Sequence, residues 1–356
     1  MKKNNLLSPL TIGSLKLSNR IVMAPLTRCR TEHDHIPNDL MTEYYAQRAS
    51  AGLIVAEATM IVKGNSAFIA EPGIYSPEQV IGWKKVTDAV HAKGGKMFLQ
   101  IWHGGRACHP SLNQGQQTVA PSAIAIEGEI MTRTGKVPHV TPRALKDEEI
   151  PGIIEAFRTA AKNAKQAGFD GVEIHGANGY LIDQFLRSSS NRRTGPYGGS
   201  IENRAKLLLQ VTDAAIEVWG ADRVGVRISP INSFNSMKDN DPVGLTLYVA
   251  QQLNTRKIAY LHLMRADFLG LQKEDVVSPA RAGFTGVLIG NMGYTPSEGH
   301  QELESKRLDA IAFGHHYVSN PDLVACVERN IPFLEPDVST FYTSGAKGYT
   351  DYPGQT

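Results

Sequence analysis

The chain has 356 residues, of which 42% are apolar, so it can bury a large core. Its length predicts one large domain or two smaller ones, and large α/β barrels reach this length as single domains. The formal net charge is +2, with acidic and basic residues interspersed. We see no basic block or basic-aromatic stripe, which argues against nucleic acid as a partner.

Cysteine usage and hydropathy also limit the class of protein. The three cysteines, Cys29, Cys108 and Cys326, lie far apart at spacings that match no zinc or iron–sulfur site. A sparse, odd count favours a reducing compartment. We find neither the apolar region of a signal peptide nor an apolar run near the ~20 residues of a membrane helix. We therefore expect a cytoplasmic protein, monomeric or homodimeric, with no membrane partner.

Short runs rich in Val, Ile, Leu and Phe recur along the chain and predict eight buried strands. They are residues 20–24, 52–56, 96–101, 171–174, 224–228, 259–263, 286–289 and 310–313. Helical patterns separate most of them, most clearly at residues 151–167 and 203–218. Eight alternating units indicate a (β/α)₈ TIM barrel. An open doubly wound sheet is the alternative, but it favours a G-x-G-x-x-G turn after the first strand, and none follows Ala24.

Two further segments lie outside this alternation of strands and helices. Residues 10–17 predict an N-terminal hairpin around Gly13 and Ser14, which we expect to close the bottom of the barrel. A long loop insertion at about residues 103–143 follows strand 3 and contains β-like pieces such as residues 124–126. Long insertions at the catalytic end of a barrel usually form lids or substrate walls. We expect residues 1–356 to form a single barrel domain with this insertion.

The most informative stretch directly follows the fourth predicted strand. It places His175, Asn178 and Tyr180 within six positions of one another. Histidine and asparagine can both donate hydrogen bonds to one oxygen, and a tyrosine nearby can supply a proton. An enzyme that polarises a carbonyl and then protonates a neighbouring carbon needs this combination. In TIM barrels the carboxyl ends of the strands form the active site, which is where these residues fall.

Other strand ends carry residues that suit a flavin. Gln100 can donate and accept hydrogen bonds at the edge of the ring, and Arg227 is always charged and can neutralise an anionic ring. Thr27 can donate to a ring carbonyl and tune the potential. Glycines follow the seventh and eighth strands, where barrels usually build a phosphate site from backbone amides. These glycines are Gly290, Gly293 and Gly314.

Several segments together resemble the Old Yellow Enzyme family of FMN-dependent ene-reductases. The resemblance runs from about Leu7 to Pro353 and is most specific at residues 168–204, which contain HGANGYLIDQFL and YGGS. Residues 19–28, 44–49, 100–106 and 319–323 also resemble family segments. The thermophilic-type subgroup carries a cysteine at the position of Thr27. The threonine therefore resembles the main bacterial subgroup.

The resemblance implies a cofactor, a reaction and roles for individual residues. Tightly but non-covalently bound FMN takes electrons from NADPH or NADH in a ping-pong cycle and reduces activated alkenes. The implied substrates are enones, maleimides and nitroalkenes, with nitrate esters as a further candidate class. His175 and Asn178 bind the substrate oxygen, Tyr180 is the proton donor, and Trp102 and Tyr342 shape the cavity. The implied FMN-binding residues are Pro25, Leu26, Thr27, Ala58, Gln100, His175, Arg227, Asn291, Gly293, Gly314 and His315.

The chain departs from the family pattern at two strand ends. The family usually has arginine after the eighth-strand glycine, whereas this chain has His315. Histidine is shorter and only partly charged near neutral pH, so we expect weaker phosphate binding or a compensating contact. Arg265, after the sixth strand, is also unusual and is expected to alter the cavity.

Several alternatives stay open. A 2,4-dienoyl-CoA reductase-like flavin barrel is one, although that type has clustered cysteines, which this chain lacks. A flavin-binding barrel without turnover is another, supported only by His315. An aldolase-like barrel needs a lysine at the end of a central strand, where we see none. His103 and His109 have no carboxylate or cysteine at ligand spacing, so we expect no metal.

Overall fold

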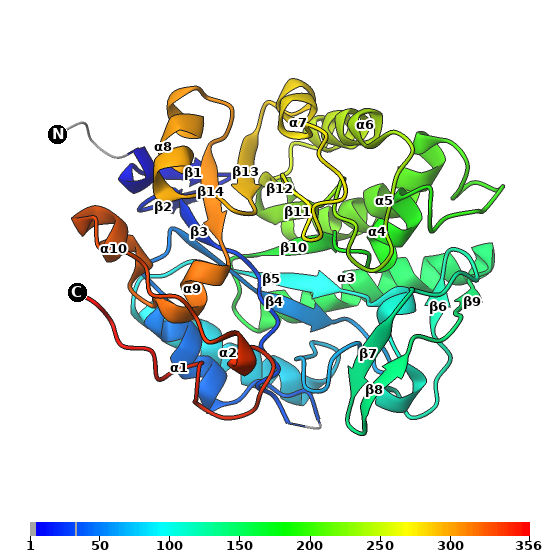
Figure 1. Cartoon of the computed structure of the whole chain (residues 1–356), viewed down its shortest axis with the longest axis horizontal. Helices are drawn as coiled ribbons and strands as arrows, with labels where there is room; N and C mark the ends of the chain where they lie inside the picture. Colours follow the sequence, from blue (N-terminus) through cyan, green and yellow to red (C-terminus); the bar gives the residue numbers. More distant parts are fainter. Residues whose placement is uncertain (1–4, 33) are drawn as a thin grey trace.

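The computed structural model describes residues 5–32 and 34–356. Eight parallel strands form a closed barrel at its centre (Figure 1), in which β14 pairs with β3 and closes the ring. The predicted TIM barrel is therefore confirmed. The barrel strands are β3 (Ile21–Met23), β4 (Leu53–Met60), β5 (Met97–Trp102), β10 (Gly171–Gly176), β11 (Val224–Ile228), β12 (Tyr260–Met264), β13 (Val287–Asn291) and β14 (Ala310–Phe313).

The predicted strands agree with the observed ones except for their ends, and β4 differs most. It extends to Met60, beyond the expected end at residue 56, and all of its residues are buried. Its register against β5 shifts between Ala56 and Thr59, which marks a β-bulge. A bulge bends a strand and redirects its side chains. This one contains Ala58, a predicted FMN-binding residue.

Helices surround the barrel and cover its outer face (Figure 1). The predicted helices at residues 151–167 and 203–218 correspond to α3 (Ile150–Gln166) and α5 (Ile201–Trp219). The Ser200 side chain accepts the Asn203 N–H at the start of α5 and so satisfies a free backbone donor. The other helices are α1 (Asp39–Gln47), α2 (Pro77–Ala92), α4 (Leu181–Leu186), α6 (Pro242–Thr255), α7 (Val277–Gly283), α8 (Pro296–Glu304), α9 (His315–Ser319) and α10 (Leu323–Arg329).

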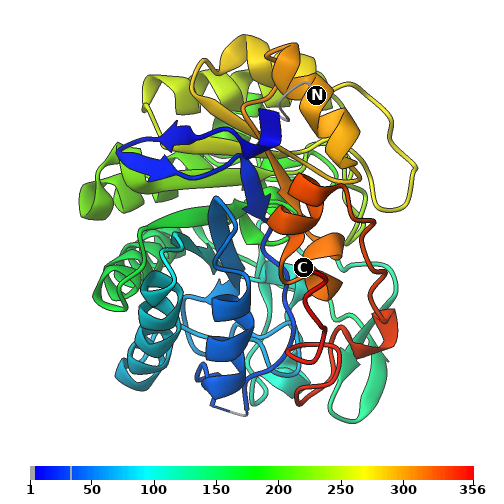
Figure 2. The ribbon, with the colours of Figure 1, turned by 90° about the vertical axis from the view of Figure 1, so that its left-hand side faces the viewer.

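The predicted N-terminal hairpin is present and consists of β1 (Leu10–Ile12) and β2 (Leu15–Leu17) (Figure 2). Ile12, Leu15 and Leu17 belong to one buried cluster with Phe98 and Tyr260, which lie near the amino ends of β5 and β12. Apolar side chains of the hairpin thus cover the end of the barrel opposite the carboxyl ends of the strands.

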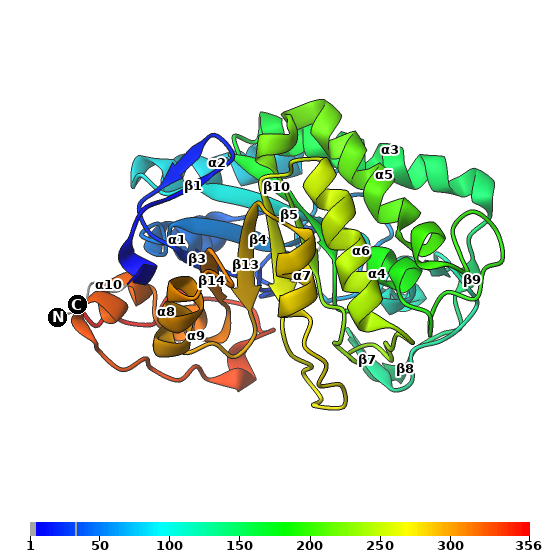
Figure 3. The ribbon, with the colours of Figure 1, turned by 90° about the horizontal axis from the view of Figure 1, so that it is seen from above.

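The expected insertion after β5 contains little regular structure. A two-stranded hairpin, β7 (Glu129–Thr132) and β8 (Gly135–Pro138), projects from it, and β6 (Val119–Ala120) pairs with β9 (Arg143–Ala144). Residues 124–126, expected to be β-like, form no strand, because the Ile124 N–H donates to the Ser122 carbonyl at 2.8 Å and the Ile124 carbonyl accepts from Nη1 of Arg106 at 3.1 Å. In Figure 3 this hairpin and the loop after β12 project on one side, whereas β1 and β2 lie on the other.

Among the described residues, no helix combines the length and the apolar character required to cross a membrane.

Candidate active site

His175 and Tyr180 lie in contact at the carboxyl end of β10. Their ring centroids are 5.0 Å apart in an edge-on arrangement, and the Tyr180 ring is likewise 5.0 Å from that of Trp102. All three side chains are at most 7% exposed. The structure therefore brings together the predicted oxygen-binding histidine, the predicted proton donor and one predicted cavity residue.

The hydrogen bonding of His175 determines which of its nitrogens can donate. Nδ1 lies 3.3 Å from the backbone nitrogen of Ala177 and accepts its N–H. Burial lowers the pKa of His175 well below its usual value, and the nearby charge of Arg227 acts in the same direction. A neutral imidazole whose Nδ1 accepts must carry its proton on Nε2. His175 thus offers one N–H donor and no charge.

Asn178 occupies a tight turn that fixes its position. Its backbone has a φ of 57°, in the left-handed region that asparagine tolerates better than most residues. Its N–H donates to Oγ of Ser229 at 2.8 Å, and its carbonyl accepts from Nδ2 of Asn235 at 2.9 Å. In the side chain, Oδ1 accepts a hydrogen bond from Nδ2 of Asn232 at 2.8 Å. Hydrogen bonds therefore fix both the main chain and the side chain of Asn178.

Tyr180 retains its phenolic proton. Burial raises its pKa further above the ordinary value, which is near 10. The hydroxyl is therefore protonated throughout the neutral range. This is the state that a proton donor requires.

A buried polar network forms the floor below these residues, inside the barrel. The Glu173 carboxylate accepts hydrogen bonds from Nε2 of Gln100 at 2.8 Å, the hydroxyl of Tyr260 at 3.0 Å and Nδ1 of His262 at 2.9 Å. Burial by itself raises the pKa of Glu173, but His262, Arg227 and these hydrogen bonds hold it below its usual value. The ionised carboxylate fixes one amide hydrogen of Gln100 and leaves its carbonyl oxygen for another partner.

Arg227 and Asn291 connect this floor to the seventh and eighth barrel strands. Nη2 of Arg227 donates to Oδ1 of Asn291 at 2.7 Å, and Nδ2 of Asn291 donates to the carbonyl of Ala312 at 2.8 Å. Nε of Arg227 is buried and, in the described part of the chain, has no hydrogen-bond partner. Such a donor is costly unless a ligand satisfies it. Arg227 and Asn291 are held in place by these hydrogen bonds, and the Nε–H of Arg227 is left for a ligand. This arrangement is suited to the polar, negatively charged FMN that the sequence predicts.

The three glycines of the predicted phosphate region differ in the space around them. Gly290 lies within β13, and a Cβ added there would come within 2.3 Å of the Leu308 side chain, so it is a packing glycine. Gly293 has a φ of 69°, and a Cβ added there would meet no atom within 4 Å. A Cβ on Gly314 would lie 3.4 Å from the Leu26 side chain, so the loop after β3 packs against the loop after β14. Pro25 is buried, whereas Thr27 is partly exposed. The predicted FMN residues of the first, seventh and eighth strands thus adjoin one another.

The His315 side chain is directed toward the C-terminal segment. Its Nε2 lies 3.4 Å from a Glu335 carboxylate oxygen, and its ring centroid is 5.7 Å from that of Phe341. The imidazole is half exposed. A carboxylate beside His315 disfavours an anionic phosphate there, and this supports the expectation of weaker phosphate binding at this position.

Arg265, the other departure, lies over the Tyr294 ring with its guanidinium carbon 3.5 Å from the ring centroid. It also donates to the carbonyls of Met292 and Gly293 at 3.1 and 3.0 Å. These contacts direct its charge toward the loop after β13.

Aromatic side chains extend outward from Tyr180 in a row. The ring centroids of Trp102 and Phe68 are 6.2 Å apart, and those of Phe68 and Tyr342 are 5.8 Å apart. Exposure rises along the row from Trp102, which is fully buried, to Tyr342 at 60%. Tyr342 thus lies at the rim, and the sequence prediction omitted Phe68, which connects it to the interior.

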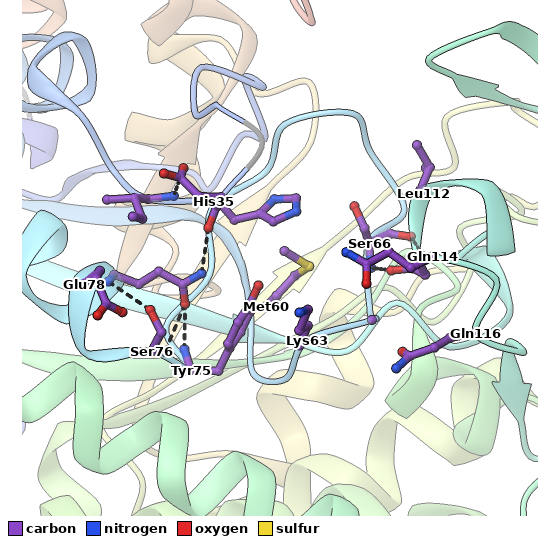
Figure 4. Close-up of a pocket in the computed structure, with 15 residues that line it drawn as sticks. His35, Met60, Lys63, Ser66, Tyr75, Ser76, Glu78, Leu112, Gln114 and Gln116 are labelled. Atoms are coloured by element: carbon purple, nitrogen blue, oxygen red, sulfur yellow. Dashed lines mark hydrogen bonds between the residues drawn. The ribbon is translucent and has the colours of Figure 1, made fainter.

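A separate cavity of about 640 Å³ lies between the loops that contain His35, Lys63, Ser76 and Gln114 (Figure 4). It adjoins the predicted site through Met60, which pairs with Trp102 across β4 and β5, and through Tyr75, which packs on the cluster that contains Trp102 and Tyr180. None of the residues predicted to bind FMN, nicotinamide or substrate lines it. Among the described residues, no cluster of His, Cys, Asp and Glu is suited to a metal ion.

Comparison with known proteins identifies the family. The model of the NADH:flavin oxidoreductase / NADH oxidase family matches residues 5–333. The chain belongs to this family. A probable flavin mononucleotide-dependent alkene reductase from Leishmania infantum is 51% identical over 354 residues, covering 98% of this chain and 97% of the relative.

Solved structures give the same result. The old yellow enzyme from Trypanosoma cruzi superposes with a TM-score of 0.97 at 44% identity, covering 99% of both chains. Morphinone reductase superposes with a TM-score of 0.95 at 45% identity, covering 99% of this chain and 97% of its own, and has also been solved with tetrahydroNAD. The predicted Old Yellow Enzyme relationship, FMN and a nicotinamide electron donor are thereby confirmed, as is the assignment to flavin oxidoreductases that act on alkenes.

Besides Phe68, sequence reasoning missed Glu173 and Asn232. Glu173 lies two residues before His175 on one strand, so both side chains face the barrel interior. A carboxylate in a fully buried strand was a signal that could have revealed it. Asn232 lies in the loop after β11, far from Asn178 in the sequence, and the two residues meet only in the folded structure. No local pattern in the sequence marks its bond to Asn178.

Proposed function

We propose that this chain is an FMN-dependent ene-reductase that reduces enones, maleimides and nitroalkenes with NADPH or NADH. Nitrate esters are a further substrate class within the proposal. One observation carries it: a neutral His175 that must donate through Nε2 lies beside the protonated phenol of Tyr180. This pair can hydrogen-bond an electron-rich oxygen and protonate a nearby carbon without any charged side chain at the reacting atoms.

Residues at the carboxyl ends of the strands would hold FMN in this proposal. The Gln100 amide would hydrogen-bond to the flavin ring, and the Arg227 guanidinium would offset the negative charge of the reduced ring. Both residues belong to the proposed cofactor site. We propose that this site lies within a single domain, in which residues 103–143 form a substrate wall. The remaining members are Pro25, Leu26, Thr27, Ala58, His175, Asn291, Gly293, Gly314 and His315.

When bound, FMN supplies hydride chemistry. The residues of the chain arrange the second substrate for it. His175 and Asn178 donate hydrogen bonds to the carbonyl or nitro oxygen, where negative charge develops as the β-carbon becomes saturated. Tyr180 then gives its proton to the α-carbon. Trp102 and Tyr342 border the cavity and help to exclude water from it.

The nicotinamide uses the same two donors in the preceding half of the cycle. Its carboxamide oxygen accepts from His175 and Asn178, so the nicotinamide and the alkene exclude each other and turnover is ping-pong. Relatives support the choice of alkene reduction: the Leishmania infantum protein is described as a probable alkene reductase and the rice relative, at 42% identity, as a 12-oxophytodienoate reductase.

Anaerobic titration of the purified protein tests the proposal. We expect a yellow protein whose flavin absorbance bleaches with NADPH or NADH and returns with cyclohexenone. A yellow protein that bleaches but is not reoxidised by any enone, maleimide or nitroalkene would contradict the alkene reductase. If neither nicotinamide bleaches it, the result would instead favour a flavin-binding barrel without turnover. A steady-state panel of these substrates and a nitrate ester then ranks the preference.

A further inference from the structure

Asn178 can bind a substrate oxygen only if its carboxamide presents Nδ2 and not Oδ1. The two ends of an asparagine side chain have nearly the same shape but opposite hydrogen-bonding polarity. An amide rotated by 180° would direct a lone pair at the substrate oxygen and repel it. The orientation of the Asn178 amide is therefore a requirement of the proposed reaction, and something in the protein must set it.

Asn232 is the residue in contact with the Asn178 amide. It is fully buried, and its Nδ2 donates to Oδ1 of Asn178 at 2.8 Å. In the described part of the chain, Nδ2 of Asn178 has no hydrogen-bond partner, so its two hydrogens stay available to a ligand.

The polarity of Asn232 is fixed in turn by the main chain. Its Oδ1 accepts the backbone N–H of Phe268 at 3.2 Å and lies 3.4 Å from that of Phe234. A backbone N–H can only donate, so the end of Asn232 that faces these two groups must be its oxygen. Its Nδ2 is then directed at Asn178, whose acceptor must face Asn232.

The loop that supplies the Phe268 N–H is itself held in place. The Asp267 carboxylate accepts the N–H and hydroxyl of Ser233 and the backbone N–H groups of Leu269 and Leu271. Residues 267–271 are thereby tied to the loop after β11, and the backbone donor at Phe268 has little freedom to move.

We infer that Asn232 is a positioning residue that sets the polarity of the Asn178 carboxamide and so makes Asn178 a donor toward substrate oxygens. The inference rests on the proposed ene-reductase function. The inference predicts different effects on two kinds of ligand. An enone or phenolate oxygen only accepts hydrogen bonds, whereas a nicotinamide carboxamide carries both an acceptor and a donor. A nicotinamide that faces a reversed Asn178 can turn its amide so that its oxygen still accepts from Nε2 of His175 while its N–H donates to Oδ1 of Asn178.

The Asn232→Asp variant tests this distinction, because aspartate has almost the same shape but no donor. The ionised carboxylate of this variant accepts from Nδ2 of Asn178 and turns Oδ1 of Asn178 toward the substrate. We expect reoxidation by cyclohexenone to slow about 100-fold, the usual effect of losing one oxyanion donor. A phenol that binds the oxidised holoenzyme should lose affinity by a similar factor, measured from the flavin absorbance. Flavin reduction by the nicotinamide should slow less than about 5-fold, within the net effect of one hydrogen bond.

Asn235→Ala is the matched control. It removes the 2.9 Å hydrogen bond to the backbone carbonyl of Asn178, which is similar in length to the bond from Asn232, and does not touch the Asn178 side-chain amide. It should change both half-reactions by the same factor. Asn232→Ala is a second variant in case aspartate impairs folding. It frees the amide to adopt both orientations, and we expect about a 5-fold preferential loss of phenol binding and enone reduction.

A double substitution separates an effect through Asn178 from a general one. In an Asn178→Ala background, Asn232→Asp should have no further effect on phenol binding, because coupled residues are not additive. If Asn232→Asp slows both half-reactions equally, or still weakens phenol binding in that background, the inference is wrong. A wild-type protein that no alkene reoxidises would instead contradict the proposed function. The two failures are therefore distinguishable.

Discussion

The end of β10 and the ends of β13 and β14 contribute to the same predicted site but are constructed differently. At β10 the functional groups are side chains, and each is held by a specific neighbour: His175 by the Ala177 N–H and Asn178 by Asn232. At the ends of β13 and β14 the backbone is open at Gly293, and the side chain expected at the phosphate, His315, faces Glu335. The first region is suited to chemistry and the second to holding a cofactor, so substitutions in them should have separable effects.

The largest expected effect is at β10. Tyr180→Phe removes the proton donor, and reoxidation by an enone should slow by about 10²- to 10⁴-fold, as for the loss of a general acid. FMN content and reduction by the nicotinamide should stay near the wild-type values, since neither needs that proton. Anaerobic stopped-flow measurement of each half-reaction checks this. Tyr342→Phe is the control, because it removes a hydroxyl at the exposed rim. Equal slowing of both half-reactions would refute the role of Tyr180.

The next effect concerns Arg227, which links the floor of the site to Asn291. Arg227→Met removes a buried charged donor, and FMN should bind about 10- to 100-fold more weakly, the range for a hydrogen bond to a charged group. Equilibrium titration of the apoprotein with FMN, followed by fluorescence, measures the change. Arg227→Lys keeps the charge but not the planar geometry and should recover part of the affinity. Unchanged FMN affinity in Arg227→Met would remove this residue from the cofactor site.

A smaller gain is expected at β14. His315→Arg places a permanent positive charge where family members usually carry one, and it should strengthen FMN binding by about 2- to 5-fold, as for an exposed ion pair. The same fluorescence titration, repeated at high salt, should show the gain shrink. His315→Gln, which is uncharged, should show no gain. Weaker binding by the arginine variant would mean that the phosphate lies away from this position.

The smallest expected effect is the pH response of the enone half-reaction. Burial and Arg227 lower the pKa of His175, so the imidazole stays neutral when an ordinary histidine, near pH 6.5, would protonate. The rate should therefore change less than about 2-fold as the pH falls from ~7.5 to ~5.5. Stopped-flow rates across that interval, with FMN content as the control, test this. A titration centred near pH 6.5 would show that His175 is not held neutral.

Much of the fold followed from the sequence because its signals are local. Strands such as Val224–Ile228 and Ala310–Phe313 are short apolar runs, and their predicted bounds match the observed ones. The bulge that extends β4 was not predicted, because it depends on the register against β5. Residues 124–126 were expected to be β-like, yet the strands of the insertion form where β7 can pair with β8.

In the site, too, the residues that a local motif reveals could be predicted, whereas those that depend on long-range contacts could not. His175, Asn178 and Tyr180 are neighbours in sequence, so a motif could reveal them. The partner of His315, Glu335, lies in a different segment and no motif predicts their contact. Asn232 acquires its role from a backbone N–H at Phe268, which three-dimensional packing alone brings to it.

The row of aromatic rings from Tyr180 to Tyr342 has a consequence for how such an enzyme can diversify. Its inner members adjoin the reacting groups, whereas Phe68 and Tyr342 come from two distant segments and meet only at the rim. Neither of these two outer rings hydrogen-bonds through its side chain to the His175, Asn178 or Asn232 side chains in the described structure. Selection can therefore exchange the outer rings to admit larger or smaller alkenes and leave the proton-transfer chemistry intact.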